Sequence, residues 1–182
     1  MTLVVLDLGS NIERETSLAT ALEKLAEKFS LRRASAVFKT SPVGMSNQPD
    51  FYNLSLEVET DKTVEDIRSI AREIEDEMGR NRTSPRFGPR NIDIDIIVYG
   101  DLVDAEKKVP HPQSTRELFV VGPMADLAPE GKHPETGETW KSLLAKLIEG
   151  ESEKDAGIVK LHEASGLPLG EKAKAALAKA PA

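Results

Sequence analysis

The sequence contains no cysteine and no apolar run long enough to cross a membrane. Without cysteine, disulfides and thiolate metal sites are excluded. A membrane-spanning helix needs about 20 consecutive, mostly apolar residues, so we expect no membrane partner. The first ten residues also lack the basic start and long apolar core of a signal peptide. These absences predict a soluble, cytoplasmic protein.

Acidic residues outnumber basic ones by 31 to 24, so the net charge is −7 and the isoelectric point is near 5.1. Broad binding to nucleic acid needs a basic surface, so we predict no nucleic-acid partner. The 182 residues are enough for one domain with a real core, whereas two full domains would be tight. An apolar content of 39% and a charged content of 30% are typical of a globular protein.

Against this acidic background, four of the ten arginines lie within eleven residues that contain no acid: Arg80, Arg82, Arg86 and Arg90. Guanidinium groups bind phosphate oxygens in a bidentate fashion. Lysine would balance an acidic surface equally well, and the chain has 14 lysines elsewhere. The choice of arginine therefore predicts oxyanion recognition. Glycines and prolines shape the segment into a loop that is able to close over a triphosphate.

Two aspartates follow this loop directly, at positions 93 and 95. In a strand their side chains share one face, while Ile92, Ile94 and Ile96 point to the other face, into the core. Carboxylates bind hard divalent cations, and two Mg²⁺ ions about 3.5–4 Å apart are a known arrangement for phosphoryl chemistry. The alternative is a solvent-facing strand that happens to carry acids. Beside the arginine loop we favour a metal–polyphosphate site.

Hydrophobic periodicity predicts an α+β fold. The expected elements are strand 3–8, helix 14–29, strand 31–39, strand 51–59, helix 63–78 and strand 92–99. Thr63 supplies a partial capping signature for the second helix, and Gly79 is suited to end it. The order βαββαβ is the ferredoxin-like arrangement, an antiparallel sheet with two helices packed on one face.

Beyond residue 100 the pattern weakens. We expect a short strand or hairpin over 102–109 and short helices near 114–120 and 139–149. Residues 170–182 are rich in alanine and lysine with a single large apolar side chain, so a helix there would bury little. We predict one domain over 1–149, and a tail or loosely packed C-terminal helical appendage over 150–182.

A third group combines an aromatic ring with an amide. Phe51 and Asn53 alternate by two and share a face; a ring stacks on a flat heterocycle, and an amide reads its edge. Phe119 is a candidate for the opposite side of that heterocycle. Taken alone, a core phenylalanine beside a turn-like asparagine is the better interpretation. His111 is a weak candidate for a phosphate contact, and Glu75 either lines the cleft or is solvated.

Residues 86–97 fit, at every defined position, the signature Arg-aromatic-Gly-Pro-Arg-x-x-Asp-hydrophobic-Asp-hydrophobic-hydrophobic. The chain thereby resembles the 6-hydroxymethyl-7,8-dihydropterin pyrophosphokinase family of folate biosynthesis. Further segments that resemble the family, in the family order, are residues 8–11, 40–44, 48–53, 79–80 and 109–112. The resemblance covers about residues 1–148.

The resemblance implies transfer of the β,γ-pyrophosphoryl group of ATP to the hydroxymethyl oxygen of a reduced pterin, with release of AMP. It implies that Asp93 and Asp95 hold two Mg²⁺ ions and that Arg80 and Arg90 lie closest to the transferred group. The implied ATP-binding residues are Glu75, Arg82, Arg86, Arg90, Ile96 and His111. The implied pterin-binding residues are Thr40, Pro42, Val43, Phe51, Asn53 and Phe119.

The chain departs from the family in places: Phe87 stands where some members have tryptophan, and Glu117 where the family often has arginine. Two alternatives stay open, another Mg²⁺-dependent nucleotidyl or phosphoryl transferase on the same fold and a non-catalytic ferredoxin-like binding module. The acidic charge and the aspartates argue against an RNA-binding module. We expect small-molecule partners only, and a monomer, with a dimer as the alternative.

Overall fold

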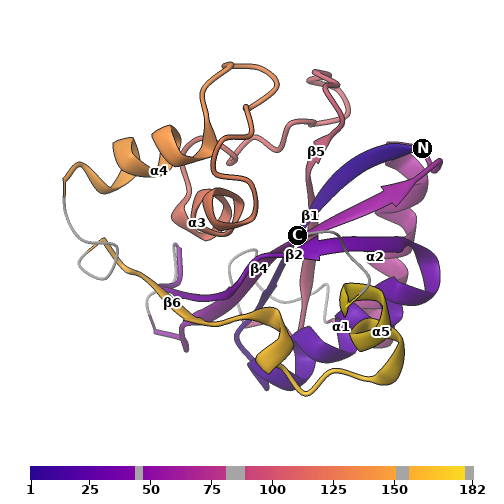
Figure 1. Cartoon of the computed structure of the whole chain (residues 1–182). Helices are drawn as coiled ribbons and strands as arrows, with labels where there is room; N and C mark the ends of the chain where they lie inside the picture. The colour runs from indigo at the N-terminus through magenta and orange to yellow at the C-terminus, as the bar shows by residue number, and fades with distance from the viewer. Residues whose placement is uncertain (44–46, 81–88, 151–155, 179–182) are drawn as a thin grey trace.

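The computed structural model describes residues 1–43, 47–80, 89–150 and 156–178. Their strands form one antiparallel sheet in the order β5-β1-β4-β3-β6, with β2 also paired to β4 (Figure 1). The strands are β1 (Thr2–Ser10), β2 (Ser30–Ala34), β3 (Val37–Thr40), β4 (Phe51–Thr60), β5 (Asp93–Tyr99) and β6 (Ile158–His162). The α-helices are α1 (Arg14–Lys28), α2 (Val64–Glu77), α3 (Leu118–Leu127), α4 (Trp140–Ile148) and α5 (Glu171–Ala178), and η1 (Ala164–Gly166) is a 3₁₀ turn.

The elements from β1 to β5 confirm the ferredoxin-like order, with one correction. The single strand expected over 31–39 is two strands, β2 and β3, both paired with β4. The break lies at Ser35 and Ala36. The Ser35 N–H donates to the Ser55 carbonyl at 2.8 Å, and the Ala36 N–H donates to the Asp126 carboxylate at 2.8 Å. The Asp126 side chain thus accepts a backbone hydrogen bond at the point where the strand is interrupted. A hydrophobic pattern does not reveal such a contact.

Helix α2 has the ends that its sequence predicts. The Thr63 hydroxyl accepts from the Asp66 N–H at 3.2 Å, and the Asp66 carboxylate accepts from the Thr63 N–H at 3.1 Å. This reciprocal pair is a capping box. After the helix, the Gly79 N–H donates to the Asp76 carbonyl. The base of the arginine loop is therefore anchored to a well-defined helix end.

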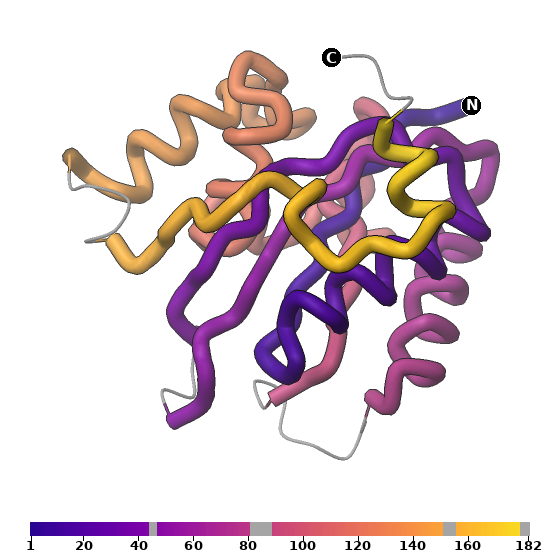
Figure 2. Tube along the Cα trace, turned by 60° about the horizontal axis from the view of Figure 1, so that its bottom comes forward, coloured from indigo at the N-terminus to yellow at the C-terminus, as the bar shows by residue number. Residues whose placement is uncertain are grey.

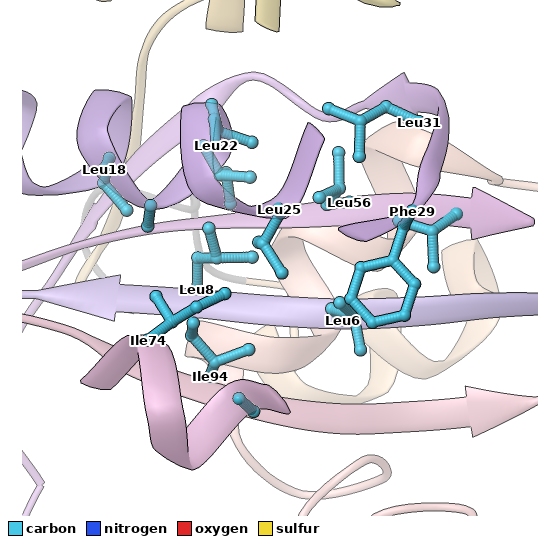
Figure 3. Packing of buried hydrophobic residues seen from close by; sticks show 14 of the residues in the cluster. Leu6, Leu8, Leu18, Leu22, Leu25, Phe29, Leu31, Leu56, Ile74 and Ile94 are labelled. Atoms are coloured by element: carbon cyan, nitrogen blue, oxygen red, sulfur yellow. The ribbon is translucent and has the colours of Figure 1, made fainter. Parts of the chain in front are cut away.

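One face of the sheet packs on α1 and α2 and forms the main core (Figure 3). Alternate strand residues supply it, among them Leu6 on β1, Leu56 on β4 and Ile94 on β5, with at most 5% of each residue exposed. Burying a side chain of this size is worth about 1.5–3 kcal/mol. This packed face supports the strands whose other side carries the polar groups described below.

The opposite face is covered in part by α3 and α4, so helices lie on both faces of the sheet and not on one alone (Figure 1). A register shift between β1 and β5 lets Ile97 and Val98 both contact this second cluster, together with Val5 and Trp140. The helix predicted near 114–120 begins only at residue 118 and runs to 127.

The C-terminal segment is part of the sheet, so the expectation of a loosely packed appendage is wrong for its described residues. Strand β6 pairs with β3, and the buried side chain of Ile158 approaches Gly122 of α3 so closely that a Cβ at Gly122 would lie 2.1 Å from it. The chain then crosses to the side of α1, where Leu167, Leu169 and Ala173 join the main core (Figure 2).

Helix α5 is attached to α1 by a carboxylate. Glu23 of α1 accepts the N–H groups of Lys172 and Ala173 at 3.1 and 2.9 Å, and Lys172 forms an ion pair with Glu27. A carboxylate at a helix N-terminus satisfies donors that lack a partner within the helix. The helical character expected of the C-terminal appendage is confirmed by α5, whereas the division of the chain at residue 150 stays a prediction.

Two smaller findings complete the fold. Residues 102–109 form a hairpin-like turn closed by a bridge between Asp104 and Val109, in line with the short strand or hairpin expected there. Within the described parts of the chain, no helix has the length and apolar character needed to span a bilayer.

Candidate active site

A cavity of about 310 Å³ lies on the sheet face that points away from α1 and α2. Strands β1, β4 and β5 form its floor, and the segment from His111 to the start of α3 closes one side. Its size is within the range of small-molecule sites. The lining residues are Asp7, Gly9, Ser41, Val43, Phe51, Asn53, Arg80, Arg90, Asp93, Asp95, His111, Gln113 and Phe119.

One end of the cavity is charged. Asp93 forms ion pairs with both Arg80 and Arg90, each to a different carboxylate oxygen. Asn11 fixes the approach to Arg90, because its side-chain oxygen accepts from the Arg90 N–H at 2.9 Å. One arginine from each end of the loop, Arg80 and Arg90, therefore contacts Asp93. Arg82 and Arg86 lie outside the described residues.

Glu75 stands behind this charged end and does not line the cavity. Its buried carboxylate accepts from the Ile94 N–H at 2.9 Å and lies 2.8 Å from the Arg80 guanidinium. Burial raises the pKa of Glu75 to about 7, against the opposing effects of the Ile94 hydrogen bond and of Arg80. Glu75 thus links the backbone between the two aspartates to Arg80.

The second aspartate, Asp95, forms no ion pair with another of the residues that the structure describes. Burial, and then the nearby charge of Asp93, raise the pKa of Asp95 to about 6. No group of three or more acidic or histidine side chains suited to a metal is present among the described residues. A pair of carboxylates still fits Mg²⁺, since this ion is commonly held by one or two carboxylates while substrate phosphates and water complete its shell.

The structure adds a carboxylate that the sequence interpretation missed. Asp7 on β1 lies opposite Asp95 on β5 and Ser55 on β4, and 5% of the residue is exposed. The Ser55 hydroxyl approaches its carboxylate at 3.4 Å. Burial, and then Asp95, raise the pKa of Asp7 well above its usual value. The available signal was an acid inside the apolar run of residues 3–8.

The other end of the cavity is aromatic and polar. The Asn53 amide donates to the Thr40 hydroxyl at 2.7 Å, which fixes its orientation. Its oxygen lies where a Cβ on Gly9 would be only 2.7 Å away, so a larger residue at position 9 would displace it. Phe51 and Phe119 line the same cavity from β4 and α3. This end has the features expected for a flat heterocycle.

His111 follows Pro110, which is joined to Val109 by a cis peptide. The His111 N–H donates to the Ile97 carbonyl at 2.8 Å, and its Nδ1 accepts from the Gln113 N–H at 3.3 Å. In the neutral ring the proton therefore sits on Nε2. Burial lowers the pKa of His111 below its usual value, so at neutral pH the ring is a neutral donor.

The remaining predicted residues have different placements. Val43 lines the cavity with Ser41, and Pro42 is half-buried between them. Ile96 lies in the main core on the opposite face, so its side chain points away from the cavity. Besides Asp7, the sequence interpretation did not single out Ser41 and Gln113 as lining residues.

Residues 5–129 match the family described as 7,8-dihydro-6-hydroxymethylpterin-pyrophosphokinase (HPPK). A 2-amino-4-hydroxy-6-hydroxymethyldihydropteridine pyrophosphokinase of Methylorubrum extorquens is 38% identical over 152 residues, covering 81% of this chain and 94% of that protein. The protein of the same name from Aquifex aeolicus is 36% identical over 137 residues, covering 74% of this chain and 85% of that protein.

The fold is also that of a solved structure, the wild-type HPPK-DHPS of Plasmodium falciparum. The TM-score is 0.65 at 16% identity, over 90% of this chain, and this chain spans 47% of that one. At this identity the likeness concerns the fold alone. The match over residues 5–129 and the identities to the bacterial proteins carry the assignment: the chain belongs to the 7,8-dihydro-6-hydroxymethylpterin-pyrophosphokinase family.

Proposed function

We propose that this chain transfers pyrophosphate from ATP to 6-hydroxymethyl-7,8-dihydropterin, giving AMP and the pterin diphosphate in folate biosynthesis. The observation that carries the proposal is a single cavity with two unlike ends. One end holds Asp93, Asp95, Arg80 and Arg90, and the other holds Asn53 with two phenylalanines. A polyphosphate donor fits the first end, and a flat, hydrogen-bonding acceptor fits the second.

The aromatic end selects and orients the acceptor. Phe51 and Phe119 stack on the pterin, and the Asn53 amide, already oriented by Thr40, reads its edge. The backbone near residues 40–43 supplies the remaining wall. This placement directs the hydroxymethyl group toward the charged end. Positioning of this kind is a large part of catalysis in phosphoryl-type transfer.

The charged end stabilises negative charge on the phosphates. Arg80 and Arg90 are held next to Asp93, so little rearrangement is needed for a guanidinium to contact the transferred group. His111, a neutral donor through Nε2, is directed to a phosphate oxygen. Arg82 and Arg86 are assigned to ATP by the family resemblance. Glu75 acts through Arg80, and Ile96 contributes to ATP binding through its backbone.

Two Mg²⁺ ions are part of the proposal, with Asp93 and Asp95 as their protein ligands. When bound, the metal neutralises phosphate charge and aligns the donor with the acceptor. Both carboxylates line the cavity, and burial together with the charge of Asp93 raises the pKa of Asp95, which supports a site for a bound cation. A monomeric state and a cytoplasmic location stay predictions.

The test is to incubate the protein with ATP, Mg²⁺ and hydroxymethyl-dihydropterin and to identify the nucleotide product. We expect AMP, formed only when the pterin is present. Formation of ADP, or hydrolysis of ATP that is independent of the pterin, would contradict the proposal. Omitting Mg²⁺ in the presence of a chelator is expected to abolish AMP formation.

A further inference from the structure

Two buried polar side chains outside the cavity form a hydrogen-bonded connection to its His111 segment. Ser114 and His133 are 2% and 1% exposed, and the Ser114 hydroxyl lies 2.9 Å from His133 Nε2. His133 Nδ1 accepts the N–H groups of Glu135 and Thr136, each at 3.3 Å. The proton of the neutral ring is therefore on Nε2, and His133 donates to Ser114.

Ser114 passes this connection on to His111. Its hydroxyl donates to the His111 carbonyl at 2.5 Å, and its N–H donates to the same carbonyl at 2.9 Å. The directions agree along the whole series, from His133 through the Ser114 hydroxyl to the His111 carbonyl. Successive hydrogen bonds of this kind strengthen one another in a buried setting.

The connection adds a third hydrogen-bonded group to His111, which is already held at two points. The His111 N–H is bound to Ile97, and its Nδ1 to the Gln113 N–H. With the carbonyl also held, the ring has one orientation relative to the cavity that it lines together with Gln113. His133 in turn belongs to a turn of its own, since its N–H donates to the Glu138 carbonyl at 2.8 Å.

We infer that Ser114 and His133 are positioning residues for the nucleotide side of the active site, acting through His111. The inference rests on the proposed function, because it assigns the His111 ring to the phosphate donor. Neither side chain lines the cavity, so neither is a catalytic residue. Small misplacements of a binding group are costly in catalysis, which gives the pair a role beyond the stability of the turn.

The matched variants are Ser114→Ala, which removes the hydroxyl from the connection, and Thr139→Ala. Thr139, six residues after His133, caps α4 by accepting from the Ser142 N–H and is not part of the hydrogen-bonded connection to His111. Loss of either group costs about 1 kcal/mol of folding free energy. The control therefore reproduces the stability loss without the connection to His111. Ser114→Cys, with a side chain of similar size and a weaker donor, provides a graded third variant.

Binding of a non-hydrolysable ATP analogue with Mg²⁺ is measured by calorimetry, and the KM values for ATP and pterin are measured by AMP formation. For Ser114→Ala we expect the analogue Kd and the KM for ATP to rise about tenfold, with the KM for pterin unchanged. Ser114→Cys is expected to lie between Ser114→Ala and wild type. Thr139→Ala is expected to match wild type in all three constants.

Wild-type values for Ser114→Ala, or an equal rise in Thr139→Ala, would overturn the inference. Trp140 provides an independent signal, because it is the only tryptophan and its ring centre lies 5.3 Å from that of His133 in an edge contact. Its emission should change in Ser114→Ala, and an unchanged emission also counts against the inference. Wild-type protein that binds the analogue but makes no AMP would refute the proposed function and leave the binding comparison intact.

Discussion

The same three strands present two contrasting rows of side chains, one residue apart in sequence. On the face toward α1 and α2, Leu56, Leu6 and Ile96 lie side by side and are buried. On the opposite face the neighbouring row is Ser55, Asp7 and Asp95. The apolar row stabilises the sheet, whereas the acidic row opposes folding because each carboxylate loses water. The residues of the candidate site therefore lie on a sheet that is stabilised by the apolar core on its opposite face.

The strongest test of this contrast is Asp95→Asn. We expect kcat for AMP formation to fall on the order of 10³-fold, because the variant loses a carboxylate ligand of the proposed Mg²⁺ site. The fold should remain, since a neutral amide is easier to bury than a carboxylate. Asp101→Asn, at an exposed position, is the control. Steady-state kinetics and circular dichroism provide the measurements, and substantial residual activity would remove Asp95 from the metal assignment.

The converse test is Leu6→Ala in the apolar row. A fully buried leucine truncated to alanine costs about 2–5 kcal/mol, and Leu6 is 0% exposed. The free energy of unfolding in urea should fall by this amount, while the KM values of the folded fraction change little. Leu3→Ala, on the same strand but 49% exposed, should have a far smaller effect. Equal losses in the two variants would contradict the burial argument.

Asp7→Asn should stabilise the protein, by about 1–2 kcal/mol at neutral pH without divalent metal. Burial raises the pKa of Asp7 in the folded state. Its proton-linked stability is therefore full below the unfolded pKa, near 3.9, and is lost as pH rises through the folded pKa. The difference in Tm between variant and wild type should be small at pH 3 and grow toward pH 8. A difference that shrinks with rising pH would reverse the sign of this argument.

The smallest effect is expected at the C-terminal helix. Glu23→Ala removes the acceptor of two α5 amides and should cost about 1 kcal/mol. Hydrogen exchange at Lys172 and Ala173 should accelerate, while exchange in β1 stays slow. Glu27→Ala removes only an exposed ion pair and is the control. Unchanged exchange at both amides would show that α5 does not depend on this cap.

Much of this arrangement was predictable, because alternation and helix caps are local. Ile94 and Asp95 were assigned to opposite faces from a period of two, and Thr63 marked the start of α2. Asp7 was missed since its partners, Asp95 and Ser55, are distant in sequence and only strand pairing unites them. A single acid within an apolar strand can be interpreted only when the residues on the paired strands are known.

The C-terminal segment shows the other limit. Leu167 and Leu169 are too few to predict a buried segment by periodicity, and they join a core whose other members include residues of α1 and β2, more than a hundred residues earlier. Likewise the separation of β2 from β3 depends on the Asp126 carboxylate, which reaches the Ala36 N–H from α3. These features come from long-range contacts, which local patterns do not encode.

Strand β6 has a consequence for self-association. It covers the edge of β3, where unpaired N–H and C=O groups would otherwise invite another chain to add a strand. The new outer edge carries Lys160, which is paired with Asp126. Charged side chains on an edge strand disfavour its pairing with a strand of another copy of the chain. The segment that the sequence predicted as a loosely packed appendage thus protects a sheet edge against the pairing that leads to aggregation.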